Sequence, residues 1–328
     1  MSITLVIVRL CNATAKVDDD MLKAVAILLS LIIIPGVSAA RGSSDTFGAM
    51  VSTGCDMPHG WKDIALRKPR FVVFGEVHGT QEAPELVSRV ACALTAQSKS
   101  VLVAVEHDVA FDPAYQAAWR QPPEKFAAAL LQAGWKGSRD GKGSVAMLGM
   151  LKQLHQLAWQ GRAIRITAFD GARDEAQRRK FSAMPRQGQR DAAQADNIRI
   201  AADAASYDIV LVLTGNGHAR RQSFERGDIN VEPMAMHLAR VGPMVTLDAS
   251  YSGGTAWTCD LKPRMRPEPG KPIRDDAIEC AVHPLSRQPD LGHTPFFSLT
   301  ASAEADDAYD GFFWLGTTHG SPPAVRDH

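Results

Sequence analysis

Short apolar runs that end in polar residues recur along the chain and predict the strands of a buried sheet. The clearest run lies in residues 71–80, which read FVVFGEVHGT. The same layout returns at 101–108 (VLVAVEHD), 164–170 (IRITAFD) and 209–218 (IVLVLTGNGH). Uninterrupted apolar runs of this length are typical of strands that are buried on both faces of a parallel sheet. Gly75 is expected to let the backbone turn where the first strand ends.

Segments with helical spacing separate these strands. The predicted helices are 82–96, two short ones within 113–135, 145–159, 190–205 and 231–241, and a fifth strand is predicted at 244–247. Residues 171–189 are rich in Arg, Asp and Gln without a clean period, and we expect them to form a mobile excursion. The alternation of strands and helices predicts an α/β layered domain with a mainly parallel central sheet flanked by helices.

The C-terminal part of the chain has a different character. Residues 251–308 lack long periodic runs and are rich in Pro, Gly and charge, so they are predicted to form loops. A bond between Cys259 and Cys280 would close this extension, whereas Cys92 could pair with Cys55 or remain a buried thiol. Residues 311–316 are predicted to return a strand to the sheet. The α/β domain would thus cover 41–250, with a disulfide-stapled C-terminal extension over 251–328.

The N-terminal segment predicts export. Residues 21–40 carry one lysine, an apolar core, a Pro-Gly break and small residues, which is the order of a secretory signal peptide. Residues 1–20 precede that signal and are interpreted as a non-native leader. The apolar stretch 24–34 is short for a membrane span of about 20 residues. We therefore expect a periplasmic or secreted protein with no stable membrane span after signal cleavage.

The charge of the chain argues against a nucleic-acid partner. Its 36 Lys and Arg balance 36 Asp and Glu, and no basic cluster interleaved with aromatic residues is present. We expect the partner to be a small-molecule ligand or substrate.

The polar residues at the strand ends are the candidate site. Carboxyl ends of parallel strands meet at one edge of a sheet, where ligands bind in α/β proteins. The candidate catalytic residues are Glu76, His78, Glu106 and His218. The candidate substrate- or ligand-binding residues are His107, Asp108, Asp170, Arg190, Asn216 and Arg220.

Three chemistries suit imidazoles that are flanked by carboxylates. They can perform general acid–base catalysis, hold a divalent metal with an open position for water, or bind haem iron through an imidazole or a tyrosinate. The sequence has no Gly-x-Ser-x-Gly elbow, no Walker loop and no His-Glu-x-x-His motif, which disfavours serine-nucleophile and nucleotide chemistry.

The paired Gly-x-x-His motifs at 75–78 and 215–218 resemble those of a known superfamily. It joins ChaN-type haem-binding proteins, erythromycin esterases and the TraB/Tiki proteins, and the resemblance covers residues 71 to about 250. The stretch GEVHGTQE at 75–82 is similar to the first esterase motif, and GNGHAR at 215–220 looks like the closing motif of the ChaN branch.

Each branch implies a different function for the same residues. The esterase branch implies that His78 is the general base for water, supported by Glu106 and His218. The Tiki branch implies a metal held by Glu76, His78 and His218. The ChaN branch implies a periplasmic protein for haem or iron uptake. The esterase-like first motif favours an exported hydrolase of an ester or amide, with the haem or iron carrier as the alternative.

Overall fold

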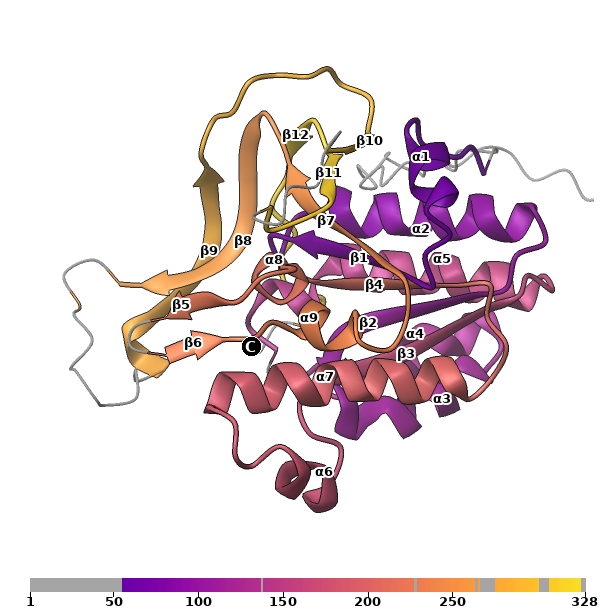
Figure 1. Ribbon diagram of the computed structural model, residues 1–328. Helices are drawn as coiled ribbons and strands as arrows, with labels where there is room; N and C mark the ends of the chain where they lie inside the picture. Colours follow the sequence, from indigo (N-terminus) through magenta and orange to yellow (C-terminus); the bar gives the residue numbers. More distant parts are fainter. Residues whose placement is uncertain are drawn as a thin grey trace, which may run out of the picture. The chain divides into compact units, whose positions relative to one another are not determined.

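The computed structural model describes residues 55–136, 138–226, 229–262, 265, 275–300 and 307–325. The predicted leader and signal peptide lie outside these residues. Within them, a seven-stranded sheet forms the centre of the fold (Figure 1). Its strands, in spatial order, are β10 (Phe296–Leu299), β11 (Gly311–Trp314), β7 (Met244–Ser250), β1 (Phe71–Glu76), β4 (Ile209–Gly215), β2 (Val101–Asp108) and β3 (Ile164–Asp170). All neighbours pair in parallel except β10 with β11.

Helices cover both faces of the sheet. One face packs against α1 (Trp61–Leu66), α2 (Glu82–Ala96), α3 (Asp112–Trp119), α4 (Pro123–Leu131) and α5 (Val145–Trp159). The other packs against α7 (Arg186–Asp203), α8 (Asn216–Ala219) and α9 (Met234–Leu238). In Figure 1, α2 and α5 lie on one side of the sheet and α7 on the other. The structure therefore confirms the predicted α/β layered domain with a mainly parallel sheet.

The first strand ends differently from the prediction. All six residues of β1 are buried, as its apolar run predicts. A Cβ atom on Gly75 would lie 2.8 Å from Ala219 Cβ and 2.9 Å from Asn216 Cα. Gly75 is thus required by the close approach of α8 and not by a turn, and the left-handed turn lies at Gly79, with φ of 79°.

Most predicted helices are present, with some boundaries shifted. α2 and α5 have the predicted bounds, and α3 and α4 are the two short helices. α7 begins at 186, earlier than predicted, and α9 is shorter. The predicted mobile excursion contains a further helix, α6 (Glu175–Lys180), where Asp174 Oδ1 accepts a hydrogen bond of 2.8 Å from the backbone N–H of Gln177. A capped helix of six residues is too short to produce a clear period.

The prediction of loops throughout 251–308 is wrong. β8 (Gly253–Leu261) and β9 (Ile278–Leu285) pair antiparallel over eight residue pairs. Cys259 lies opposite Cys280 in this register and forms the predicted disulfide with it. The remaining elements are the short strands β5 (Phe224–Arg226), β6 (Ile229–Val231) and β12 (Thr317–Thr318) and the 3-10 helices η1 (Val109–Phe111), η2 (Gly141–Gly143) and η3 (Asp275–Ala277).

The second disulfide joins Cys55 to Cys92 and so ties the segment before α1 to α2. This resolves the pairing that the sequence left open. Among the described residues, no helix has the length and apolar character that crossing a membrane requires.

Candidate functional site

Glu106, in β2, lies at the centre of the candidate site. Its side chain is buried, and both carboxylate oxygens receive hydrogen bonds. The Thr214 hydroxyl and the Gly215 backbone N–H donate to Oε2 at 2.7 and 2.8 Å, and Arg190 Nη2 donates to Oε1 at 2.9 Å. Burial opposes the charge on Glu106, but His78, His218 and Lys142 outweigh it and hold the pKa of this carboxyl well below its usual range. Glu106 is therefore an anion at neutral pH.

His78 follows β1 and lies between two carboxylates. Its Nδ1 is 3.0 Å from Glu76 Oε1, and its Nε2 is 3.4 Å from Glu106 Oε2. Burial opposes protonation of the ring, but Glu106 and then Glu76 outweigh it and raise the pKa of His78 to about 10. Burial raises the pKa of Glu76. The resting imidazole of His78 is therefore protonated, with Glu106 as its charged partner.

The loop that carries His78 is fixed by residues far along the chain. The backbone carbonyl of Gly79 accepts hydrogen bonds from the N–H groups of Trp257 at 2.9 Å and Ser321 at 2.7 Å. The next residue but one, Gln81, donates its N–H to His319 O at 2.9 Å. β8 and the C-terminal segment thus determine where the His78 imidazole lies.

His218, in the short helix α8, faces Glu106 from the β4 side. Its Nδ1 lies 2.6 Å from Asp191 Oδ1. Asp191 is buried and also accepts the backbone N–H of Met234 at 2.9 Å, which fixes its orientation. The other ring nitrogen, Nε2, is 3.7 Å from Glu106 Oε1 and 3.4 Å from Arg190 Nη1. His78 and His218 therefore face opposite oxygens of one carboxylate.

Two cations complete the cluster on the side of β3. Arg190 makes two hydrogen bonds of 2.7 Å to Asp170, which also accepts Gln194 Nε2 at 2.9 Å. Lys142 Nζ lies 3.4 Å from Asp170 and 3.9 Å from Glu106. Burial disfavours the charged form of Asp170, but Arg190 outweighs it and lowers the pKa of this carboxyl. Burial also disfavours the charged form of Lys142, but Glu106, Asp140 and Asp170 outweigh it and raise the pKa of this amine. Both cations stay charged.

Several predicted residues lie outside this cluster. Burial lowers the pKa of His107 to about 4, and its ring hydrogen-bonds Tyr115 and, at 2.7 Å, the Lys142 carbonyl. The Asp108 carboxylate caps η1. The Arg220 guanidinium lies over the rings of Phe224 and Tyr309. The backbone carbonyl of Asn216 accepts the Tyr309 hydroxyl at 2.9 Å.

Sequence reasoning missed three members of the cluster, Lys142, Asp191 and Thr214. Lys142 comes from a glycine-rich loop that approaches the His78 loop closely, since a Cβ on Gly141 would lie 2.1 Å from Gly79 N. Asp191 adjoins the predicted Arg190, and that adjacency is the signal that could have identified it. Thr214 follows the apolar run of β4, and apart from that position no sequence pattern marks it as a site residue.

The metal set that the Tiki branch implies, Glu76, His78 and His218, stays a prediction. Both ring nitrogens of His78 face carboxylates, and His218 Nδ1 is bonded to Asp191. In the part of the chain that the structure describes, no three His, Cys, Asp or Glu side chains are arranged to hold a metal ion.

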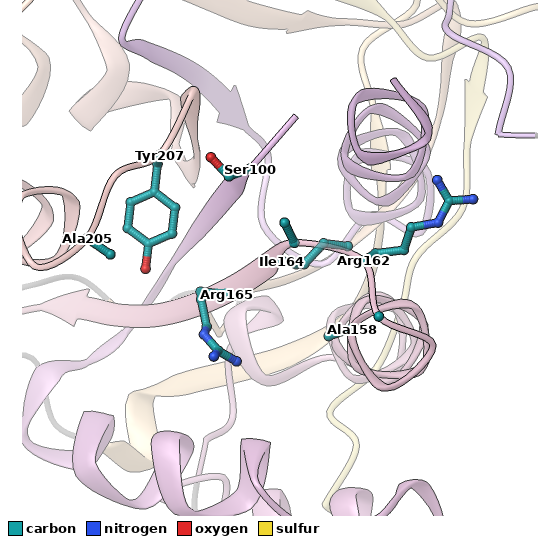
Figure 2. A pocket seen from close by; sticks show the side chains of 9 residues that line it. Ser100, Ala158, Arg162, Ile164, Arg165, Ala205 and Tyr207 are labelled. Carbon is teal, nitrogen blue, oxygen red and sulfur yellow. The ribbon is translucent and has the colours of Figure 1, made fainter. Parts of the chain in front are cut away.

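A hollow of about 350 Å³ lies at the opposite ends of the strands, beside the starts of β2, β3 and β4. Figure 2 shows Arg162 and Arg165 extending away from each other there, so their guanidinium groups do not converge on one ligand. This hollow contains none of the predicted site residues. Arg165 lies in β3, the edge strand of the sheet, and its side chain is exposed.

Comparisons with known proteins identify the fold. Neither a family model nor a curated protein sequence matches this chain. Among solved structures, an erythromycin esterase mutant, EreC, in its open conformation matches with a TM-score of 0.56 and 12% identity, over 81% of this chain and 95% of that chain. This chain has the erythromycin esterase fold. The structure thus confirms, at the level of fold, the resemblance that the sequence indicated.

Two other solved structures match with lower TM-scores. A succinoglycan biosynthesis protein matches with a TM-score of 0.51 and 10% identity, over 80% of this chain and 91% of that chain. ChaN of Campylobacter jejuni, described with cofacial heme, has a TM-score of 0.38 and 14% identity, over 58% of this chain and 86% of that chain. The ChaN match is too low to support an argument about this chain.

Proposed function

We propose that the protein is an exported hydrolase that uses water to cleave an ester or an amide at the carboxyl edge of the sheet. The main support is that His78 and His218 face opposite oxygens of the buried Glu106 carboxylate, each with a further carboxylate of its own. Two imidazoles in different environments provide an acid and a base within reach of one small molecule. The erythromycin esterase fold agrees with this reaction class.

His218 is the better candidate for the base. When its Nδ1–H donates to Asp191, the lone pair of Nε2 is directed toward Glu106 and Arg190. His78 is protonated at neutral pH, with a pKa of about 10, and suits the role of acid. This assignment reverses the roles that the resemblance implies for the two histidines.

The proposed reaction moves one proton from water to His218 and one from His78 to the leaving group. Water attacks the carbonyl carbon while His218 Nε2 takes one of its protons, and the Lys142 ammonium, which also pairs with Asp170, stabilises the oxyanion. The bond from the carbonyl carbon to the leaving oxygen or nitrogen then breaks, and the leaving atom takes the Nε2 proton of His78. The proton on His218 returns to His78 through solvent, which restores the resting site.

Export is part of the proposal. Its support is the pair of disulfides, Cys55–Cys92 and Cys259–Cys280, because such bonds persist in oxidising compartments. The signal-like sequence of residues 21–40 agrees with it.

The test compares the purified protein with His78→Gln, His218→Gln and, as a control, the exposed His293→Gln. On a panel of 4-nitrophenyl esters and peptide anilides, we expect both site variants to lose about 100-fold or more in kcat, and the control to match the unchanged protein. Equal activity in all four proteins would overturn the proposal.

The same variants test the haem alternative. Titration with haemin is expected to give no saturable shift of the Soret band. A saturable shift that is lost in both site variants, together with no hydrolysis of the panel, would replace the hydrolase with a haem or iron carrier.

A further inference from the structure

A cavity of about 200 Å³ lies between α6 and α7 and borders the candidate site. Its lining residues are Gly171, Ala172, Gln177, Arg178, Phe181, Gln189, Arg190 and Ala193. Arg190 belongs to both places, because its guanidinium also bonds Asp170 and Glu106. Sites for whole drug-sized ligands have roughly 300–1,000 Å³. This cavity is smaller, so it has room for only part of such a ligand.

The chain around this cavity is strongly basic. Residues 173–190 contain six Lys and Arg but two Asp and Glu, although the whole chain is balanced. Lys180 is paired with Asp196, and Arg173 bonds the side chain of Asn197. These two cations are therefore engaged by α7.

Arg178 is held more weakly. It pairs with Glu175 at 3.2 Å, one helical turn away, with the two side chains 60% and 65% exposed. Exposed pairs of this kind contribute little to stability. The Arg178 guanidinium can therefore exchange Glu175 for an anion in the cavity that it lines, and a guanidinium binds a carboxylate through two parallel hydrogen bonds.

We propose that the α6–α7 cavity binds the acyl group of the substrate, and that this group ends in a carboxylate. This rests on the hydrolase function proposed above and names its substrate class. Arg178 binds the carboxylate, and Phe181 and Ala193 contact the carbon chain. Arg190 lines the cavity and also reaches the candidate site, where its Nη1 is 3.4 Å from His218 Nε2, so the scissile carbonyl lies next to the base.

A binding experiment tests the cavity without requiring catalysis. Succinate is titrated calorimetrically into the purified protein, Arg178→Gln and Arg179→Gln. Arg179 is the matched control, an exposed arginine on the same helix that does not line the cavity. We expect Arg178→Gln to weaken succinate binding about tenfold or more, the control to bind as the unchanged protein does, and butyrate to bind far more weakly. Equal succinate binding by all three proteins, or equal binding of butyrate, would overturn the inference.

Kinetics separate this inference from the proposed function. With monoethyl succinate, Arg178→Gln should raise KM about tenfold, while the kcat/KM for ethyl butyrate stays unchanged. Hydrolysis of both esters without preference would overturn the cavity assignment but support the hydrolase function. Succinate binding that depends on Arg178, with no ester or amide hydrolysed, would support the cavity and overturn the hydrolase.

Discussion

At the scale of single residues, the site depends on how Glu106 is kept charged while buried. Removing a carboxylate from water costs several kcal/mol unless it is paired and hydrogen-bonded. The Thr214 hydroxyl, the Gly215 N–H and Arg190 provide those bonds. The two imidazoles and Lys142 also pair with this carboxylate, so both histidines are directed at one point.

The Asp191–His218 pair leads to a prediction about catalysis. Asp191→Asn should reduce kcat about 10²–10⁴-fold, because an amide that donates to Nδ1 favours the tautomer in which Nε2 carries the proton. The measurement is kcat for the best ester of the panel, with circular dichroism to verify folding. A kcat within twofold of the unchanged protein would show that His218 is not the base.

The His78–Glu106 pair leads to a prediction about stability and pH. The pKa of His78 is raised from 6.5 to about 10. The contribution of His78 to the free energy of unfolding is therefore fully present below pH 6.5 and is lost as the pH rises through about 10. Glu106 has a lowered pKa, so its contribution is present above its ordinary value of 4.5 and lost as the pH falls through the lowered one. The His78 side chain is 27% exposed, so solvent screens part of the interaction. We expect the pair to contribute about 1–3 kcal/mol to the free energy of unfolding.

Urea unfolding at pH 7 and pH 10 measures this contribution. The difference in unfolding free energy between the unchanged protein and His78→Gln should shrink at the higher pH, whereas His293→Gln should follow the unchanged protein. The same difference at both pH values would contradict the assignment of His78 as a partly buried imidazolium.

At the scale of elements, α8 is positioned by a glycine in the neighbouring strand. Gly75→Ala should lower the free energy of unfolding by about 1–3 kcal/mol, because the new methyl group would overlap Ala219 and Asn216. Gly149→Ala is the control, since it lies on the exposed side of α5 with no atom within 4 Å of the added Cβ. The control should be neutral or up to about 1 kcal/mol more stable. Equal effects of the two changes would show that α8 does not pack against β1 at this point.

The elements that the sequence predicts well are those that are buried on both faces. The strands β1 to β4 consist almost wholly of core residues, so their apolar runs identify them. β8 and β9 escaped prediction because most residues of these two antiparallel strands are half-exposed, which leaves no apolar run. The first turns of α7 were missed for a related reason, since its inner face is polar there. Gln187, Asp191 and Gln194 bond other polar side chains or one another instead of an apolar core.

The site was predictable where it follows from strand topology. Glu76, Glu106, Asp170 and the residues after β4 lie at one edge because parallel strands end together. Lys142 and Asp191 were not predictable in this way. They arrive from a loop and from a helix, and only the packing of those segments against the sheet brings them to Glu106.

At the scale of the whole molecule, two covalent links hold segments outside the parallel strands. The Cys55–Cys92 and Cys259–Cys280 bonds close loops with sequence separations of 37 and 21. Replacing either pair by serines should lower the free energy of unfolding by about 2–4 kcal/mol. Thermal unfolding with and without a reducing agent measures this, and a transition that does not respond to reduction would contradict it.

The contacts of the Gly79 carbonyl determine when the proposed catalytic cluster is assembled during synthesis. A chain leaves the ribosome from its N-terminus, so β1 to β4 are available before Trp257 and long before Ser321. The parallel strands can form while the His78 loop still lacks the two N–H groups that hold it. A nascent chain would therefore carry all the residues of the proposed catalytic cluster without their final geometry. Hydrolytic competence would be the last property that the protein acquires.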